Sequence, residues 1–138
     1  MSEDCIFCKI VRKEVPASIV YENEAVLAFL DIRPVSEGHV LVIPKAHYET
    51  IFDTPEDLLA QVYKIVKKVA EVVKKAVKVD GISIIQQNGR AADQDIFHLH
   101  VHVIPRSIGQ KLHHFDKLAD ASRENLDRVA LKIRGNLS

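Results

Sequence analysis

One segment of this chain alternates histidine with aliphatic residues: Phe97-His98-Leu99-His100-Val101-His102-Val103-Ile104-Pro105. Side chains of a β-strand point alternately to its two faces. The alternation therefore predicts a strand over 97–104, with the three histidines on one face and the aliphatic residues packed against a core. Neighbouring histidines on such a face lie about 6.5 Å apart. We expect the histidine face to bind a ligand.

Three histidines on one strand face are compatible with two kinds of chemistry. They could bind a catalytic zinc ion, which takes three protein ligands and leaves a fourth position open. Alternatively, one imidazole could act as a nucleophile toward phosphorus while the others orient it. The strand alone leaves both open.

The remainder of the chain predicts an antiparallel α+β fold around this strand. A long amphipathic helix is expected to begin at Thr54-Pro55, a hydroxyl N-cap followed by proline, and Gly81 lies near its end. A short helix is expected over 5–14, ended by Val15-Pro16, and a last helix over 122–134, followed by Gly135. Four further strands are expected at 18–21, 25–32, 39–43 and 81–87.

Length and composition limit the function classes. With 138 residues, of which 47% are hydrophobic, the chain is expected to form one domain over 1–138, with a core over about 5–106 and a C-terminal extension over about 107–138. Nineteen basic and nineteen acidic residues give no net charge, which argues against a dedicated nucleic-acid surface. Neither a signal peptide nor an apolar run of about 20 residues is present, so a cytoplasmic protein without a membrane span is expected.

The histidine segment resembles the histidine-triad signature, His-φ-His-φ-His-φ-φ, of the histidine-triad (HIT) nucleotide hydrolases and transferases. Four other segments resemble blocks of this family in the same order: Cys5-Ile6-Phe7-Cys8-Lys9-Ile10, Ala28-Phe29-Leu30-Asp31-Ile32, the stretch from Gly38 to His47, and Asn88-Gly89 followed by Gln94. The resemblance implies a HIT-like fold: a sheet of about five strands, one long central helix, a short N-terminal helix and a C-terminal helical extension. It also implies a homodimer with joined sheets.

The resemblance assigns the catalytic roles to the three histidines. His100 matches the histidine that attacks the α-phosphate and carries the nucleotidyl group, and an imidazole with a pKa near ~6.5 is largely neutral at cell pH. Its other ring nitrogen is expected to bond the backbone carbonyl of His98, and His102 to contact the same phosphate. This chemistry requires no metal ion.

The resemblance also assigns the nucleotide-binding residues. Asp31 matches the acceptor for both ribose hydroxyls. Asn88 and Gln94 match polar side chains that contact phosphate oxygens. The apolar slot for the base is matched by Ile6, Phe7, Val15, Phe29 and Ile32.

A structural zinc site is a further implication. Cys5, Cys8, His47 and His98 match a Cys₂His₂ set found in some branches of the family. The alternative is that the thiols are buried without a metal ion. The other histidines, His39, His113 and His114, match no catalytic position and are expected at the surface or in loops.

The chain departs from the family pattern in the loop before the triad. Where the family has Ala-Gly-Gln and then often a hydroxyl residue, this chain has Ala92-Asp93-Gln94-Asp95. An ionised Asp95 beside the bound nucleotide cannot donate a hydrogen bond and repels a phosphate, although Arg90 and Arg106 could offset this. The Trp-Pro-Pro ending of the Hint branch is absent, while Ile104-Pro105-Arg106 resembles bacterial-type and Fhit-like members.

The predicted function is hydrolysis at the α-phosphorus of purine (adenosine) nucleotide derivatives through a nucleotidyl-histidine intermediate, with release of a nucleoside monophosphate. The expected substrates are dinucleoside polyphosphates, slightly favoured by the chain's ending, or nucleoside phosphoramidates. Two alternatives remain: a non-catalytic scaffold that binds nucleotides or partners, and a zinc-dependent hydrolase.

Overall fold

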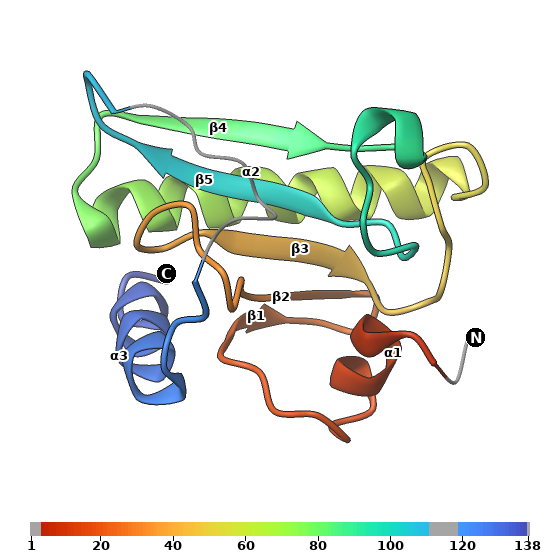
Figure 1. The fold of residues 1–138 in the computed structure, drawn as a ribbon, viewed down its shortest axis with the longest axis horizontal. Helices are drawn as coiled ribbons and strands as arrows, with labels where there is room; N and C mark the ends of the chain where they lie inside the picture. The colour runs from red at the N-terminus through yellow and green to blue at the C-terminus, as the bar shows by residue number, and fades with distance from the viewer. Residues whose placement is uncertain (1–3, 111–118, 138) are drawn as a thin grey trace.

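The structure, a computed structural model, describes residues 4–110 and 119–137 and contains a five-stranded antiparallel sheet of order β1-β2-β3-β5-β4 (Figure 1). The strands are β1 (Ile19–Glu22), β2 (Val26–Leu30), β3 (Val40–Pro44), β4 (Gly81–Gln86) and β5 (Val101–Arg106). The α-helices in these residues are α1 (Ile6–Val11), α2 (Glu56–Val77) and α3 (Arg123–Arg134). The predicted α+β fold is confirmed.

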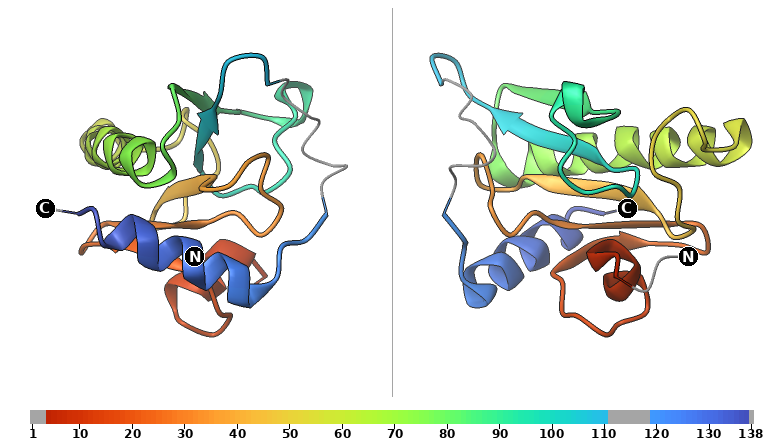
Figure 2. Two further views of the ribbon diagram at one scale, coloured as in Figure 1. Left: turned by 90° about the vertical axis from the view of Figure 1, so that its left-hand side faces the viewer. Right: turned by 45° about the vertical axis from the view of Figure 1, so that its right-hand side comes forward.

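The helices lie on both faces of the sheet (Figures 1 and 2). On one face, α2 and α3 cover the main core, to which Val40, Val42, Val101 and Val103 contribute because they alternate along β3 and β5. On the other face, α1 covers a smaller cluster around Phe29. The second face leaves room for a ligand beside α1.

The long helix starts one residue later than predicted. Pro55 is its N-cap and Glu56 its first residue, whereas the Thr54 hydroxyl donates to the carbonyl of Thr50 at 2.6 Å. Thr54 therefore closes the preceding turn and does not cap the helix. The helix ends at Lys78, which adopts a left-handed conformation with φ of 54°, and Gly81 instead begins β4.

The histidine strand is shorter than predicted. Strand β5 begins at Val101, so His102 lies in it while His98 and His100 precede it. The reason is visible at Leu99, whose N–H donates to the carbonyl of Tyr48, 2.7 Å away, and not to a neighbouring strand. The alternation survives this change, because Leu99 and Val101 are fully buried in the protein core.

The other predicted elements are found with shifted ends. Helix α1 stops at Val11, ahead of the predicted Val15-Pro16, and Lys13 then adopts a positive φ of 64°. Helix α3 agrees closely with its prediction: the Ser122 side chain accepts the N–H of Asn125, and Gly135 ends the helix. Within the described ranges, no helix is long and apolar enough to cross a membrane.

Candidate active site and metal centre

A cavity of about 350 Å³ opens on the α1 side of the sheet. This is within the range of small-molecule sites, about 300–1,000 Å³. It is lined by the predicted nucleophile His100 and by most of the predicted nucleotide-binding residues: Ile6, Phe7, Phe29, Asp31, Ile32, Asp95 and His102. Val15 is not among the lining residues and packs against the small cluster around Phe29.

His100 presents one ring nitrogen to the cavity. Its Nδ1 lies 2.7 Å from the carbonyl oxygen of His98, and because a carbonyl only accepts, Nδ1 carries the proton. In the neutral ring, Nε2 then carries a lone pair. Burial lowers the pKa of His100, while the hydrogen bond to His98 and the charge of Asp95 oppose this. The ring is neutral at pH 7, and its edge-on contact with Phe7, at 5.1 Å between centroids, restricts its orientation.

Two carboxylates face the same cavity. Asp95 Oδ1 lies 3.8 Å from His100 Nε2 and its side chain is 73% exposed. Asp31 is more enclosed, and its Oδ1 accepts the N–H of Arg33 at 2.9 Å. Desolvation raises the pKa of Asp31 to about 6, and the nearby charge of Asp95 contributes to this rise. Asp31 thus keeps an acceptor oxygen within the cavity wall at the end of β2.

Two of the predicted phosphate-binding side chains lie outside the cavity. Gln94 is 3% exposed, accepts the N–H of Gly89 and donates to the carbonyls of Glu49 and Ile96. Asn88 accepts the N–H of Ile51 at 2.7 Å and exchanges hydrogen bonds with Gln86. Their amides hold the loop that brings Asp95 to the cavity, and in this structure they do not face it.

The prediction that His39 lies at the surface is wrong. His39 is completely buried, its Nε2 is 2.9 Å from His102 Nδ1, and the same atom lies 3.5 Å from Asp31 Oδ2. The sequence carried a signal for this position: His39 shares alternation parity with Leu41 and Ile43 of β3, whose side chains face the α1 side. His113 and His114 lie outside the described residues.

Sequence reasoning also missed four lining residues: Ile10, Arg33, Leu41 and Ile96. Ile10 follows Ile6 by one helical turn, and Leu41 alternates with Ile43, so periodicity could have identified both. Arg33 is paired through its Nε with Asp120 at 2.9 Å. Among the described residues, Arg33 is the one lysine or arginine that lines the cavity.

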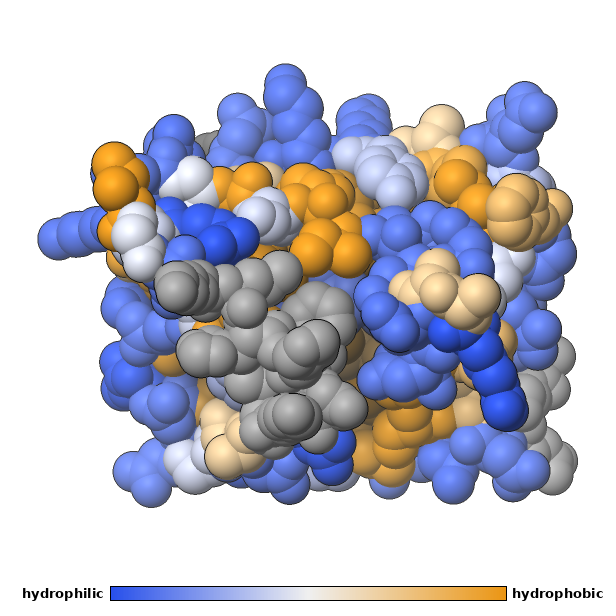
Figure 3. Space-filling model, turned by 45° about the horizontal axis from the view of Figure 1, so that its top comes forward, coloured by the Kyte–Doolittle hydropathy of each residue, from blue (hydrophilic) through white to orange (hydrophobic). Residues whose placement is uncertain are grey.

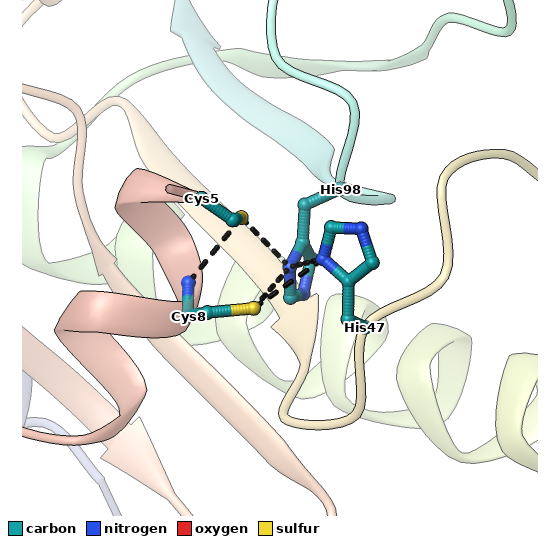
Figure 4. Close-up of side chains that lie close together, drawn as sticks. All are labelled: Cys5, Cys8, His47 and His98. Carbon is teal, nitrogen blue, oxygen red and sulfur yellow. Dashed lines mark hydrogen bonds between the residues drawn. The ribbon is translucent and has the colours of Figure 1, made fainter. Parts of the chain in front are cut away.

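Four predicted metal ligands converge beside the cavity (Figure 4). Cys5 and Cys8 come from the start of α1, His47 from the segment after β3, and His98 from the segment before β5. Their ligand atoms all lie within 4.8 Å of one another. His98 Nε2 donates to the carbonyl of Pro44 at 2.8 Å, which leaves the lone pair on Nδ1 directed at the thiols.

The spacing of these four ligand atoms fits a zinc ion. His98 Nδ1 lies 3.4 Å from Cys5 Sγ, 3.6 Å from Cys8 Sγ and 3.2 Å from His47 Nδ1. Cys8 Sγ lies 3.3 Å from His47 Nδ1. Neighbouring ligands of a tetrahedral zinc with bonds of about 2.0–2.3 Å are separated by about 3.3–3.8 Å. The donor set and its spacing therefore suit a structural zinc.

The geometry separates the triad histidines by role. His98 belongs to the cysteine cluster, and His102 to a second group of potential ligands with Asp31 and His39, while His100 belongs to neither. Zinc chemistry through all three histidines needs their lone pairs to meet at one point. In the described residues, hydrogen bonds instead direct the lone pair of His98 at the cysteine cluster and that of His100 into the cavity.

Comparison with known proteins agrees with this geometry. Residues 12–109 match the HIT domain family. An uncharacterized HIT-like protein of Methanocaldococcus jannaschii is 47% identical over 131 residues, which cover 95% of this chain and 99% of the relative. The adenosine 5'-monophosphoramidase of Saccharomyces cerevisiae is 42% identical over 102 residues (74% of this chain, 62% of the relative), and the adenylylsulfatase of Arabidopsis thaliana is 42% identical over 106 residues (77% and 54%).

Solved structures are similar over nearly the whole chain. A Hit-like protein from Bartonella henselae superposes with a TM-score of 0.92 at 41% identity and covers 99% of both chains. A zinc-bound histidine triad family protein from Mycobacterium smegmatis gives a TM-score of 0.86 at 37% identity, covering 97% of this chain and 93% of its own. Sequence, fold and the arrangement of the histidines thus agree, and this chain belongs to the HIT family.

Proposed function

We propose that this protein is a nucleotide hydrolase that acts at the α-phosphorus of adenosine or other purine nucleotide derivatives, with His100 as the nucleophile. One observation carries the proposal: His100 is buried, neutral and held by the carbonyl of His98 so that the lone pair of Nε2 faces the cavity. A positioned neutral imidazole is a competent nucleophile toward phosphorus.

The reaction proceeds in two displacements. First, His100 Nε2 forms a bond to the α-phosphorus, and the bond from phosphorus to the leaving group breaks. The leaving group keeps the electron pair and takes a proton from water, while His100 keeps its own proton on Nδ1, bonded to the carbonyl of His98. Water then attacks the phosphorus of the nucleotidyl-imidazole, the N–P bond breaks, and a nucleoside monophosphate is released. His102, beside His100 with 5.0 Å between ring centroids, contacts the phosphate oxygens.

The remaining wall of the cavity suits a nucleoside. Asp31 provides acceptor oxygens for the ribose hydroxyls, a role that a carboxylate performs without a competing donor. Phe7, Phe29 and Ile32 form an apolar wall for the base. Two relatives, named as an adenosine 5'-monophosphoramidase and an adenylylsulfatase, support an adenylyl group as the transferred part.

The charge of the cavity bears on the leaving group. Asp31 and Asp95 are acidic, and Arg33, the one lysine or arginine among the described residues that lines the cavity, is paired with Asp120. A polyphosphate leaving group would carry several negative charges past Asp95, whereas an amine carries none. Of the two expected substrate classes, the cavity therefore favours phosphoramidates over dinucleoside polyphosphates.

Cys5, Cys8, His47 and His98 are proposed to hold a structural zinc. The ion would join the start of α1 to the segments that flank β3 and β5, which stabilises the wall of the cavity. His100 follows His98 by two residues, so the zinc would also fix the carbonyl to which His100 donates.

A homodimer joined through β4 is proposed as well. Strand β4 ends the sheet and has no buried residue, whereas every residue of β3 is buried. Ile84 is 43% exposed there, and apolar side chains gather over this part of the molecule in Figure 3. An exposed strand edge with apolar side chains is a surface that a second sheet can extend.

The test is turnover by the purified protein of adenosine 5'-phosphoramidate and of a dinucleoside polyphosphate, measured as release of adenosine monophosphate. His100→Ala should abolish turnover of both substrates while the fold, measured by circular dichroism, is retained. A folded wild-type protein that binds adenosine monophosphate but turns over neither substrate would favour the non-catalytic scaffold. Loss of turnover when zinc is removed from a protein that stays folded would favour the zinc-dependent hydrolase.

A further inference from the structure

His39 is a buried polar residue for which the proposed reaction gives no role. It is 0% exposed and comes directly before β3, after a turn in which Gly38 has a φ of 91°. A Cβ on Gly38 would lie 3.0 Å from Val77 Cγ1, so glycine is needed here for conformation and for packing. The turn places the buried His39 ring within hydrogen-bond distance of His102.

The hydrogen bonds of His39 determine which of its nitrogens carries the proton. The backbone N–H of Val35 donates to His39 Nδ1 at 3.1 Å, so this atom contributes a lone pair. In the neutral ring, the proton is therefore on Nε2. Burial lowers the pKa of His39 to about 3, with a further decrease from the nearby His100, so the neutral ring is the form present at pH 7.

The proton of His39 determines the state of the next ring. His39 Nε2 lies 2.9 Å from His102 Nδ1, and its proton leaves His102 Nδ1 as the acceptor. The alternative acceptor, Asp31 Oδ2, is farther away at 3.5 Å. Burial, followed by the nearby His100 and His39, lowers the pKa of His102 well below its usual value, so this ring is also neutral. A neutral ring that accepts at Nδ1 carries its proton on Nε2.

We propose that His39 is a positioning residue that fixes His102 as the Nε2–H tautomer, so that His102 presents a donor to the cavity beside the lone pair of His100. Two adjacent imidazoles then have opposite tasks: one attacks phosphorus and the other donates to a phosphate oxygen. The second task rests on the proposed function, but the tautomer itself does not.

The same arrangement disfavours a metal ion held by Asp31, His39 and His102, although their ligand atoms lie within 4.8 Å of one another. To bind a metal through Nε2, His39 would have to move its proton to Nδ1. Nδ1 would then be a donor facing another donor, the backbone N–H of Val35, and their hydrogen bond would be lost. The backbone N–H of Val35, between β2 and β3, therefore favours a hydrogen bond from His39 Nε2 over a metal ion at this cluster.

Two substitutions of His39 test its two hydrogen bonds one at a time, the bond to His102 and the bond from Val35. In His39→Gln, the amide nitrogen reaches the position of Nε2 and can still donate to His102. In His39→Asn, the amide oxygen occupies the position of Nδ1 and can accept from Val35, but the side chain is too short to reach His102. Both variants replace the ring by a buried amide, so a purely structural role of His39 predicts similar effects for the two.

The measurement is the tautomer of His102 in the ligand-free protein at pH 7, from long-range proton–nitrogen correlations of ¹⁵N-histidine-labelled samples. We expect the Nε2–H form in the wild type and in His39→Gln, and loss of this preference in His39→Asn. The kcat/KM for adenosine 5'-phosphoramidate should fall about tenfold in His39→Asn relative to His39→Gln, the value of about one hydrogen bond.

The proposal is overturned if wild-type His102 carries its proton on Nδ1, or if its tautomer is unchanged in His39→Asn. Zinc bound by Asp31, His39 and His102 in a protein whose cysteine cluster is already loaded would overturn it too. The wild-type spectrum alone decides the matter if neither variant folds. A wild-type protein without turnover would refute the proposed function but leave the tautomer measurement valid, so the two failures are distinguishable.

Discussion

Replacement of Asp31 by asparagine should stabilise the protein while weakening nucleotide binding. Burial raises the pKa of Asp31 from its ordinary value of 3.8 to about 6. Since one pKa unit corresponds to about 1.4 kcal/mol, the carboxylate costs the folded state up to about 3 kcal/mol of stability above pH 6. The backbone N–H of Arg33 keeps an acceptor in the variant, because asparagine retains one side-chain oxygen.

The sign of the pH dependence follows from the direction of the pKa change. Below about pH 3.8 Asp31 is protonated in both the folded and the unfolded chain, so it imposes no cost. As the pH rises to about 6, the unfolded chain loses its proton first and the folded state is progressively disfavoured. Asp31→Asn should therefore be more stable than the wild type by up to about 3 kcal/mol at pH 8, and by much less at pH 4.

The assay is urea denaturation at half-unit pH intervals from 4 to 8, with Asp80→Asn as the matched control. Asp80 is exposed, so its replacement should not change the free energy of unfolding by a pH-dependent amount. In parallel, the affinity for adenosine monophosphate should fall in Asp31→Asn. A stability difference that is the same at pH 4 and pH 8, or a destabilised variant at pH 8, would refute the reasoning.

Three further predictions follow from the same site. Asp95→Ser should raise turnover, because it removes the repulsion between the Asp95 carboxylate and the phosphate. At the high dielectric of an exposed group, the repulsion by one phosphate charge about 6 Å away is about 1 kcal/mol, which corresponds to about a fivefold change in rate. The increase should be larger for a dinucleoside polyphosphate than for a phosphoramidate. Steady-state kinetics with Asp93→Ser as control checks this, and unchanged or lower turnover would count against it. Chelation of zinc should lower the melting temperature and release about one equivalent of metal, measured by atomic emission; a Cys8→Ser protein with equal metal content would contradict it. Ile84→Arg should convert a dimer to a monomer in light scattering, and a monomeric wild type would end that proposal.

Much of the fold was predictable because packing follows local periodicity. The alternation of the histidine segment predicts that Val101 and Val103 pack in the core, and the structure places both there, beneath the amphipathic helix α2. The ends were less predictable, because they depend on single hydrogen bonds. Thr54 donates to Thr50 and not to the helix, and Leu99 donates to Tyr48 before β5 begins.

The candidate site was predictable where one strand or helix supplies it. His100, Asp31 and Phe7 face the cavity as expected. His39 was not identified, because its position beside His102 depends on the pairing of β3 with β5, in which Leu41 is opposite His102. The amide of Gln94 accepts from Gly89 in its own loop and donates to the carbonyl of Glu49 in the segment between β3 and α2, and no sequence spacing indicates these bonds.

The central claim, that His100 forms a bond to phosphorus, is tested most directly by trapping the intermediate. Protein and adenosine 5'-phosphoramidate are mixed under single-turnover conditions and quenched in alkaline denaturant, which preserves the N–P bond, and the peptides are then analysed by mass spectrometry. One adenylyl group on His100, absent in His100→Ala, is the predicted result. An adduct on another residue, or a His100→Ala protein that still hydrolyses the substrate at the wild-type rate, would contradict the account.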